Sequence, residues 1–382
     1  MGKPEIRFKG YTDEWEQRKV VEVAPLQRGF DLPSASMKPG KYPVVMSNGI
    51  GGYHFEYKVK GPGVVTGRSG TIGKLHYIED DYWPHNTTLW VTDFNGNNQK
   101  FIYYLYQGLD LNRFGTGSGV PTLNRNDVHD AIVSVPSKNE QERISAYLTI
   151  LDQLITLHQR KCDEVKSLKK YMLQKMFPQN EQKVPEIRFE GFTEAWEQRK
   201  LEECLSEITY GFTNPMSDTE EGPWKITAKD ILDGMINYSS ARHTSQIEYD
   251  DLTNKSKPLV GDLLLTKDGT LGRTAIVDAE NVCINQSVAL LRFNEKCSVQ
   301  YAKTLLDTPM YQKQMLDDAG GGTIKHIYIT KVDKMFISVP CMKEQERLVL
   351  FFNNLDNLIT LHQQKCEELK KIKKFMLQKM FV

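Results

Sequence analysis

Two long segments of the chain carry the polar and apolar spacing of amphipathic helices. The first, residues 139–177, has no glycine or proline and repeats apolar side chains at intervals of three and four, which is the spacing of one helix face. At about 1.5 Å of rise per residue it would form a rod of roughly 55–60 Å. Its face consists of Ile144, Leu148, Leu151, Ile155, His158, Cys162, Val165, Met172 and Met176, and the second segment repeats it with Leu348, Phe352, Leu355, Ile359, His362, Cys366, Leu369, Met376 and Met380.

The helical segments are near copies of each other, and so are the stretches that open each half of the chain. Residues 151–177 and 355–381 are offset by 204 positions, whereas the opening stretches 4–20 and 185–201 are offset by 181. The inserts between these frames hardly match. The chain is therefore a cyclic two-fold repeat opened at one of its two linkers, and we expect its ends to lie near each other. A repeated frame around divergent inserts indicates one scaffold with two different recognition surfaces.

Each apolar stripe needs a partner, and the other copy is the simplest one. We predict that the two helices pack as an antiparallel, coiled-coil-like pair with pseudo-two-fold symmetry. The predicted organisation is a first domain with its lead-in at 1–138, a spacer helix at 139–177, a linker at 178–184, a second domain at 185–342 and a second spacer helix at 343–382.

The inserts have the β-branched runs and glycine-rich turns of mixed domains. Residues 63–66 and 262–266 have the composition of strands, and each is followed by a glycine-rich turn and a second short strand, at 74–78 and 274–277. This order predicts one β-hairpin in each insert. The predicted fold class is mixed α/β (α+β), with two domains joined by two long antiparallel helices.

Composition narrows the class of protein. At 382 residues the chain exceeds one ordinary core, and no apolar run approaches the roughly 20 residues of a membrane helix. The six cysteines form no CxxC pair, so we expect reduced thiols in a cytoplasmic protein. Lys plus Arg and Asp plus Glu both number 49. This balance disfavours a stand-alone, salt-driven nucleic-acid binder, but it allows local basic loops or a partner that supplies phosphate contacts.

The glycine-rich turns are the first candidates for binding. Residues 67–73 fail as a P-loop, because five residues separate Gly67 from Gly73 where four are needed. A tight hairpin turn and a DNA-facing loop both fit. The recurrence of Gly-Thr-x-Gly beside cations in both copies favours DNA, since backbone N–H groups with one cation suit a phosphate oxygen. The candidate DNA-binding residues are Arg68, Ser69, Gly70, Thr71 and Lys74 in the first insert and Lys267, Asp268, Gly269, Thr270 and Arg273 in the second.

Polar residues follow each hairpin at corresponding places. His85 and Asn86 follow the first, and Asn285 and Gln286 follow the second. Asn and Gln can bind adenine in the major groove, but they also satisfy backbone groups in turns. The glycine-rich stretches 115–119 and 320–323 fit either recognition loops or plain connectors.

The helices also pair a histidine with a cysteine, His158 with Cys162 and His362 with Cys366. Brought together, the four would have the ligand types of a zinc site. We interpret them instead as seam residues of a helix pair and predict no metal site. The helix lysines fit a solvated or partner-facing surface better than a DNA track.

Catalytic signatures are missing from the sequence. It has no Asn/Asp-Pro-Pro-Tyr/Phe motif, no G-x-G loop before a Rossmann-like helix, and no HExxH, GxSxG or Walker A motif. We predict that the chain is not an enzyme.

One family combines these features. In each half a variable insert ends at Val-Pro, at Val135-Pro136 and Val339-Pro340, and the sequence EQER and a long Leu-rich helix follow. Over essentially its whole length the chain resembles the specificity subunits of type I restriction–modification systems.

The resemblance implies a role and partners. Each target-recognition domain would read one half of an asymmetric, bipartite site in double-stranded DNA, and the helices would set the half-site spacing. The helices and the EQER regions would dock two modification subunits, which bind S-adenosylmethionine and methylate a flipped adenine. Restriction subunits would add translocation and cleavage with ATP and Mg, so this subunit would bind no cofactor itself. The docking residues would be Glu140, Gln141, Arg143, Glu344, Gln345 and Arg347.

A second class of function stays open at this stage. The chain could be a helical scaffold that joins two protein-interaction domains and does not bind DNA. DNA binding that depends on Arg68, Lys74, Lys267 and Arg273 would separate the two.

Overall fold

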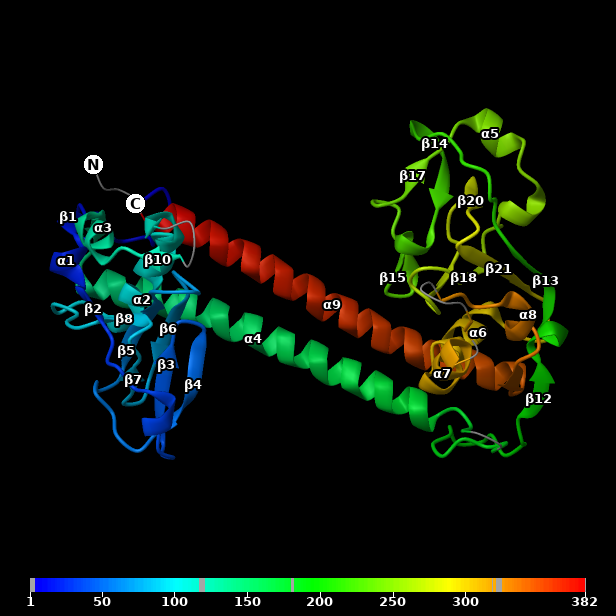
Figure 1. The fold of residues 1–382 in the computed structure, drawn as a ribbon, viewed down its shortest axis with the longest axis horizontal. Coiled ribbons are helices and arrows are strands. Elements are labelled where there is room, and N and C mark those ends of the chain that lie inside the picture. Colours follow the sequence, from blue (N-terminus) through cyan, green and yellow to red (C-terminus); the bar gives the residue numbers. More distant parts are fainter. Residues whose placement is uncertain (1–3, 117–120, 180–181, 318, 321–324, 382) are drawn as a thin grey trace. The chain divides into compact units, whose positions relative to one another are not determined.

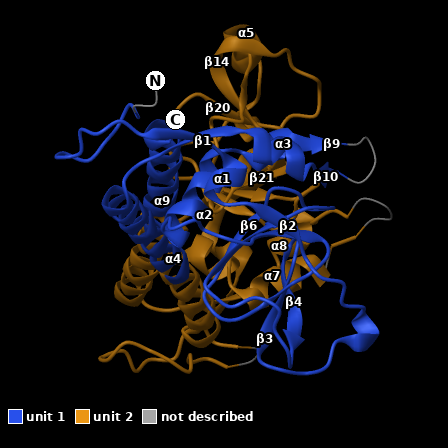
Figure 2. Cartoon of the chain, turned by 90° about the vertical axis from the view of Figure 1, so that its left-hand side faces the viewer, with its two compact units in different colours: residues 1–160, 362–382 blue, residues 161–361 orange. Residues whose placement is uncertain are grey.

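The computed structural model describes residues 4–116, 121–179, 182–317, 319–320 and 325–381. The chain divides into two compact units, residues 1–160 with 362–382 and residues 161–361, which Figure 2 colours separately. Both boundaries fall inside the two long helices, so each unit holds one insert and one half of each helix. None of the described helices is long and apolar enough to cross a membrane.

The inserts of the two units are built alike. Unit 1 has a four-stranded sheet of order β2-β8-β5-β6 and a three-stranded sheet β4-β3-β7, and unit 2 has β13-β21-β18-β19 and β17-β14-β20 in the same roles (Figure 1). The strands of unit 1 are β1 Glu16–Lys19, β2 Leu26–Arg28, β3 Tyr42–Met46, β4 Gly49–His54, β5 Gly63–Gly67, β6 Leu75–Ile78, β7 Trp83–Pro84, β8 Thr88–Val91, β9 Gly115–Thr116, β10 Thr122–Leu123 and β11 Ile132–Val135. Those of unit 2 are β12 Glu197–Lys200, β13 Leu205–Tyr210, β14 Thr219–Ile226, β15 Ile231–Leu232, β16 Met235–Ile236, β17 Arg242–His243, β18 Leu263–Thr266, β19 Thr274–Ile276, β20 Val282–Ile284, β21 Val288–Phe293 and β22 Phe336–Val339.

Helices complete each unit. The short ones are α1 Val20–Val23, α2 Gln99–Gly108 and α3 Arg125–Asp130 in unit 1 and α5 Gln246–Asp250, α6 Val299–Leu306, α7 Pro309–Asp317 and α8 Ile329–Val332 in unit 2. The long ones are α4 Lys138–Lys175 and α9 Met342–Met380. The predicted mixed fold with two long helices is confirmed, and both predicted hairpins form, as β5 with β6 and β18 with β19.

The repeated opening stretch forms part of the frame. Strand β1 pairs antiparallel with β11, the strand that leads into α4, and Glu16 faces Val135. Strand β12 pairs with β22 in the same register, with Glu197 facing Val339. The opening stretch therefore closes the insert at the foot of the long helix, which explains why it recurs in both halves.

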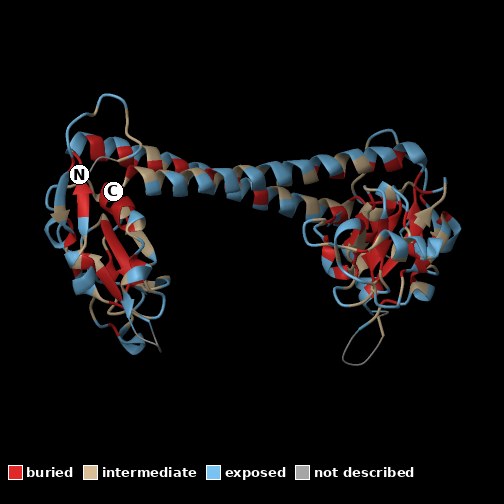
Figure 3. Ribbon diagram, turned by 90° about the horizontal axis from the view of Figure 1, so that it is seen from above, coloured by how far each residue is buried: buried red, intermediate tan, exposed pale blue. Residues whose placement is uncertain are grey.

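The long helices pack against each other inside each unit. In unit 1, Leu148 and Leu151 of α4 share a core with Leu369 and Met380 of α9. In unit 2 the opposite halves meet, with Leu173 and Met176 of α4 beside Phe352 and Leu355 of α9. The start of one helix thus meets the end of the other, and the predicted antiparallel pairing is confirmed. Figure 3 shows that buried residues gather in the inserts and along one side of the helices.

The two ends of the chain lie together in unit 1, as the cyclic repeat predicts. The amide of Ile6 donates to the carbonyl of Lys379, 3.1 Å away, and the Lys379 ammonium pairs with Glu5. The same contact recurs in unit 2, where Ile187 donates to Lys175, 2.9 Å away. In unit 2 the two residues are joined by the linker between the repeats, whereas Ile6 and Lys379 lie near opposite ends of the chain.

Candidate nucleic-acid interface

The two hairpin turns are held by the same backbone bonds. The Arg68 amide donates to the Thr87 carbonyl at 2.8 Å, and the Lys267 amide donates to that of Ser287 at 2.9 Å. In each turn the glycine before the shared threonine, Gly70 or Gly269, has a positive φ, of 78° or 81°, a conformation that residues with a Cβ atom disfavour. These bonds place Arg68 and Lys267 at equivalent positions of the two units.

The cations of the turns differ in their partners. Within the described residues the Arg68 guanidinium has no hydrogen-bond or ion-pair partner, whereas the Lys267 ammonium pairs with Asp268 at 2.7 Å and lies over the Tyr210 ring. Lys74 and Arg273, also equivalent, each donate to a backbone carbonyl of a neighbouring segment, Asn48 and Ile231. These two charged side chains therefore also hold their turns to the neighbouring segments.

In unit 2 the turn carries a small charged network. Burial of Asp268 opposes its ionisation, but hydrogen bonds from Lys267 and His326 outweigh burial and hold the pKa of Asp268 below its usual range. The equivalent residues of unit 1 are Ser69 and Thr122, which form the same isolated β-bridge as Asp268 and His326. At this bridge one backbone frame thus presents two uncharged side chains, Ser69 and Thr122, in unit 1 and the Asp268–His326 pair in unit 2. Ser69 is half-buried, and Thr71 and Thr270 are exposed.

The polar residues that follow the hairpins divide into two kinds. His85 and Asn285 bond their own turns, to Thr87 and Ser287, which matches the turn-stabilising alternative. Asn86 donates to Asp31, and Gln286 is exposed. Residues 117–119 and 321–323 of the glycine-rich stretches lie outside the described residues.

A cleft of about 410 Å³ beside the first turn gathers three arginines, Arg28, Arg68 and Arg125. Arg28 ends β2, and Arg125 begins α3, which follows the segment whose Leu123 amide bonds the Arg68 carbonyl at 2.7 Å. The sequence pattern marks Arg68 as a candidate and does not mark the other two. The segments are far apart along the chain, and no local motif marks Arg28 or Arg125.

The Glu and Gln side chains that open each EQER sequence make hydrogen bonds within their own unit. Glu140 is 1% exposed, accepts two hydrogen bonds from Arg7 at 2.7 and 2.8 Å and one from the Trp15 indole. Gln141 is 3% exposed and its side-chain oxygen accepts from the amide of Asn98, the N-cap of α2.

The second copy repeats these bonds. Arg188 pairs with Glu344 at 2.7 and 2.8 Å, and Gln345 accepts from the amide of Ser298, the N-cap of α6. These four buried side chains are occupied within their units, so the structure corrects their assignment to a partner surface. Arg143 and Arg347 are exposed and lie over the rings of Phe8 and Phe189, and for them docking stays a prediction.

The histidine and cysteine pairs of the long helices are seam residues. In unit 1 the Nδ1 atoms of His158 and His362 lie 3.0 Å apart. The Cys366 thiol donates to the Ile155 carbonyl, and in unit 2 the Cys162 thiol donates to that of Ile359. Among the described residues, no group of three or more His, Cys, Asp or Glu side chains is placed to hold a metal ion. The alternative of a zinc site therefore gains no support.

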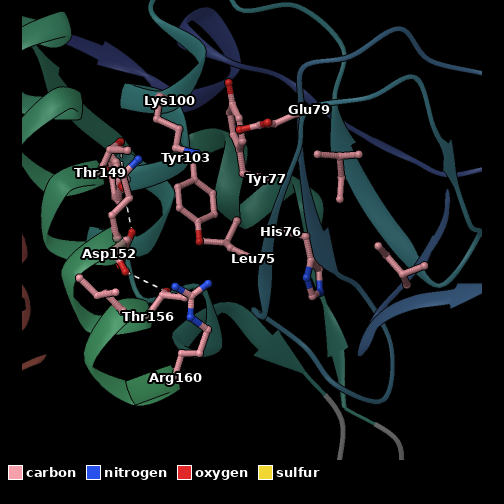
Figure 4. A pocket seen from close by; sticks show the side chains of 15 residues that line it. Leu75, His76, Tyr77, Glu79, Lys100, Tyr103, Thr149, Asp152, Thr156 and Arg160 are labelled. Atoms are coloured by element: carbon pink, nitrogen blue, oxygen red, sulfur yellow. Dashed lines mark hydrogen bonds between the residues drawn. The ribbon is translucent and has the colours of Figure 1, made fainter. Parts of the chain in front are cut away.

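A larger cleft of about 810 Å³ lies in unit 1 between β6, α2 and α4. Figure 4 shows Lys100, Tyr77 and Tyr103 on one side and Thr156 and Arg160 on the other. The Lys100 ammonium lies 3.7 Å from the centre of the Tyr77 ring, and burial lowers the pKa of this lysine. The cleft adjoins the helix face rather than the two hairpin turns.

Comparison with known proteins decides the family. The family model described as "Type I restriction modification DNA specificity domain" matches residues 12–167 and 196–371, which together cover both inserts and most of both helices. The chain belongs to this family. It is the DNA-recognition subunit of a type I restriction–modification system, and the scaffold alternative is not favoured.

Relatives of the specificity family match most of the chain. A putative type I restriction enzyme specificity subunit of Haemophilus influenzae is 24% identical over 361 residues, which cover 89% of this chain and 89% of the relative. The crystal structure of the S subunit of a type I system from M. genitalium has a TM-score of 0.66 at 14% identity and covers 99% of each chain. A chain from a structure concerned with the assembly of a type I system has a TM-score of 0.59 at 16% identity, covering 97% of this chain and 98% of that one. These structures share the fold of the specificity subunit.

Proposed function

We propose that each unit reads one half of a bipartite, asymmetric site in double-stranded DNA, and that α4 and α9 set the spacing between the half-sites. The observation that carries the proposal is the repeated frame. Equivalent hairpin turns, fixed by equivalent backbone bonds at Arg68 and Lys267, present different side chains in the two units. Two recognition units that share a backbone frame but present different side chains suit a DNA site whose halves differ in sequence.

The chemistry of modification and cleavage lies on partner subunits in this proposal. Two modification subunits, docked on the long helices and near Arg143 and Arg347, bind S-adenosylmethionine and methylate adenine. Restriction subunits use ATP and Mg to translocate and cleave DNA. This chain binds no cofactor and catalyses no step, and it determines which DNA sequence the complex recognises. Its formal net charge of zero suits a subunit that shares phosphate contacts with its partners.

The test is methylome sequencing of cells that co-express this chain with a matching modification subunit, against cells that lack this chain. We expect a new split motif with methyladenine on both strands, which would reveal the two half-sites together. If the complex assembles and no new motif appears, the two-reader proposal is wrong.

A further inference from the structure

The equivalent positions of the two units carry different chemistry beside the hairpin turn. Arg28 faces Leu89 across β2 and β8, and Tyr210 faces Ala289 across β13 and β21. The next residues, Gly29 and Gly211, both donate to the strand opposite, to Thr88 and Val288. Arg28 and Tyr210 therefore occupy the same place on the frame, whereas the neighbouring place holds a cation in both units, Arg68 or Lys267.

This difference separates two kinds of DNA contact. Phosphates are the same in every sequence, so a cation that holds the backbone is useful in both units. Arg68 fits that role, because no carboxylate pairs with its guanidinium within the described residues, whereas Asp268 neutralises part of the charge of Lys267. Bases differ between half-sites, and a side chain found in only one unit suits a base contact. Arg28 and Arg125 are such side chains in unit 1, because α8 has Ile329 where α3 has Arg125.

The surroundings of Arg28 favour a base over a phosphate. Its guanidinium lies 3.3 Å from the Asp31 carboxylate, which also accepts a hydrogen bond from Asn86. A carboxylate beside the guanidinium repels phosphate but not the neutral edge of a base, and it orients the donors. No such carboxylate pairs with Arg125 within the described residues. Guanine presents O6 and N7 as two acceptors in the major groove, which match the fork of an arginine.

We infer that Arg28, buttressed by Asp31, reads a guanine in the half-site of unit 1, while Arg68 holds a phosphate in the same cleft. The inference rests on the proposed function, since it requires that unit 1 faces DNA. Unit 2, with Tyr210 at the equivalent position, reads its half-site by other contacts.

The first experiment compares methylomes of the wild-type chain and Arg28→Lys, each co-expressed with the modification subunit. Lysine keeps the charge and loses the fork. We expect one G·C position of one half-site to become degenerate, with a loss of selectivity of roughly 10- to 100-fold, while the other half-site and the spacer stay unchanged. Arg18→Lys is the matched control, because Arg18 lies on β1 outside the cleft and also pairs with an exposed carboxylate, that of Glu22, and it should leave the motif intact. Arg28 is 54% exposed, and a thermal melt of each variant checks that it folds.

The second experiment measures binding of the purified complex with modification subunits to duplexes that carry 7-deazaguanine at the affected position. Loss of N7 should weaken wild-type binding roughly tenfold or more and should not further weaken binding by Arg28→Ala, whose side chain has no donor for N7.

An unchanged motif with Arg28→Lys, degeneracy at an A·T position, or equal weakening on every sequence would overturn the guanine assignment. These results differ from failure of the proposed function, in which the wild-type chain itself yields no split motif.

Discussion

The guanidinium of Arg7 and the carboxylate of Glu140 form a two-pronged ion pair, with nitrogen–oxygen distances of 2.7 and 2.8 Å, that ties the start of the chain to the first turn of α4. The pair is nearly closed to water, with side-chain exposures of 15% and 1%. Removing one partner of such a pair leaves a buried charge without compensation.

Glu140→Ala should therefore lower the free energy of unfolding of unit 1 by about 3 kcal/mol. Urea unfolding, followed by a probe in unit 1, measures the change. Glu142→Ala is the control, because Glu142 is exposed on the same turn and should change stability by less than about 0.5 kcal/mol. Unchanged stability of Glu140→Ala would contradict the structural role.

Shortening both long helices by matched turns should change the spacer and leave the half-sites alone. Residues 157–163 and 361–367 are equivalent, and deleting both keeps the two helix faces in register. The loss of about two turns, roughly 10 Å, corresponds to about three base pairs at 3.4 Å each. Methylome sequencing gives the spacer directly, and altered half-site bases would refute the idea of the helices as a ruler.

Exchange of one insert should change one half-site only. Replacing residues 21–134 with the insert of another specificity subunit keeps β1 and Val135, the last residue of β11, from the frame, and the new insert supplies the rest of that strand. We expect a new first half-site beside an unchanged second half-site and spacer. A change in both halves would rule out two independent readers.

Arg68→Gln should weaken binding to all DNA sequences alike, because a phosphate contact carries no sequence information. The slope of log K against log salt should fall by about one unit. Lys267→Gln should have a smaller effect, since Asp268 already neutralises part of the lysine charge. Arg18→Gln, on β1 of the frame, controls for net charge, and a sequence-dependent loss with Arg68→Gln would point to base reading instead.

The Asp268 network predicts a pH dependence of stability. Because hydrogen bonds from Lys267 and His326 hold the pKa of Asp268 below its usual range, the unfolded state takes up its proton first as the pH falls. The ionised carboxylate thus stabilises unit 2 above the ordinary aspartate pKa of about 3.9, and this contribution is lost as the pH falls through the lower folded-state pKa.

Urea unfolding of the wild type and Asp268→Asn should differ by a steady amount near neutral pH, and the difference should shrink in acid. Ser69→Ala, at the equivalent position of unit 1, should give a difference that does not depend on pH. A constant difference for Asp268→Asn down to pH 3 would show that the charge of Asp268 does not contribute.

The sequence by itself determined the frame of this protein. The spacing of residues such as Leu148, Leu151, Phe352 and Leu355 determined the two helices, because a helical period of 3.6 residues depends only on residues that are close along the chain. The repeat offsets then predicted antiparallel pairing and adjoining ends, and the glycines predicted both hairpins. Each of these follows from residues that are close along the chain or from one copy matching the other.

Only the tertiary structure decided what the polar residues do. Glu140 and Gln141 look like surface residues of a helix start, yet they are buried by Arg7 and by the N-cap of α2, which are distant in sequence. The cleft of Arg28, Arg68 and Arg125 joins three segments that no motif connects. Burial and side-chain neighbours arise from long-range packing, so a local pattern gives the element but not its partners.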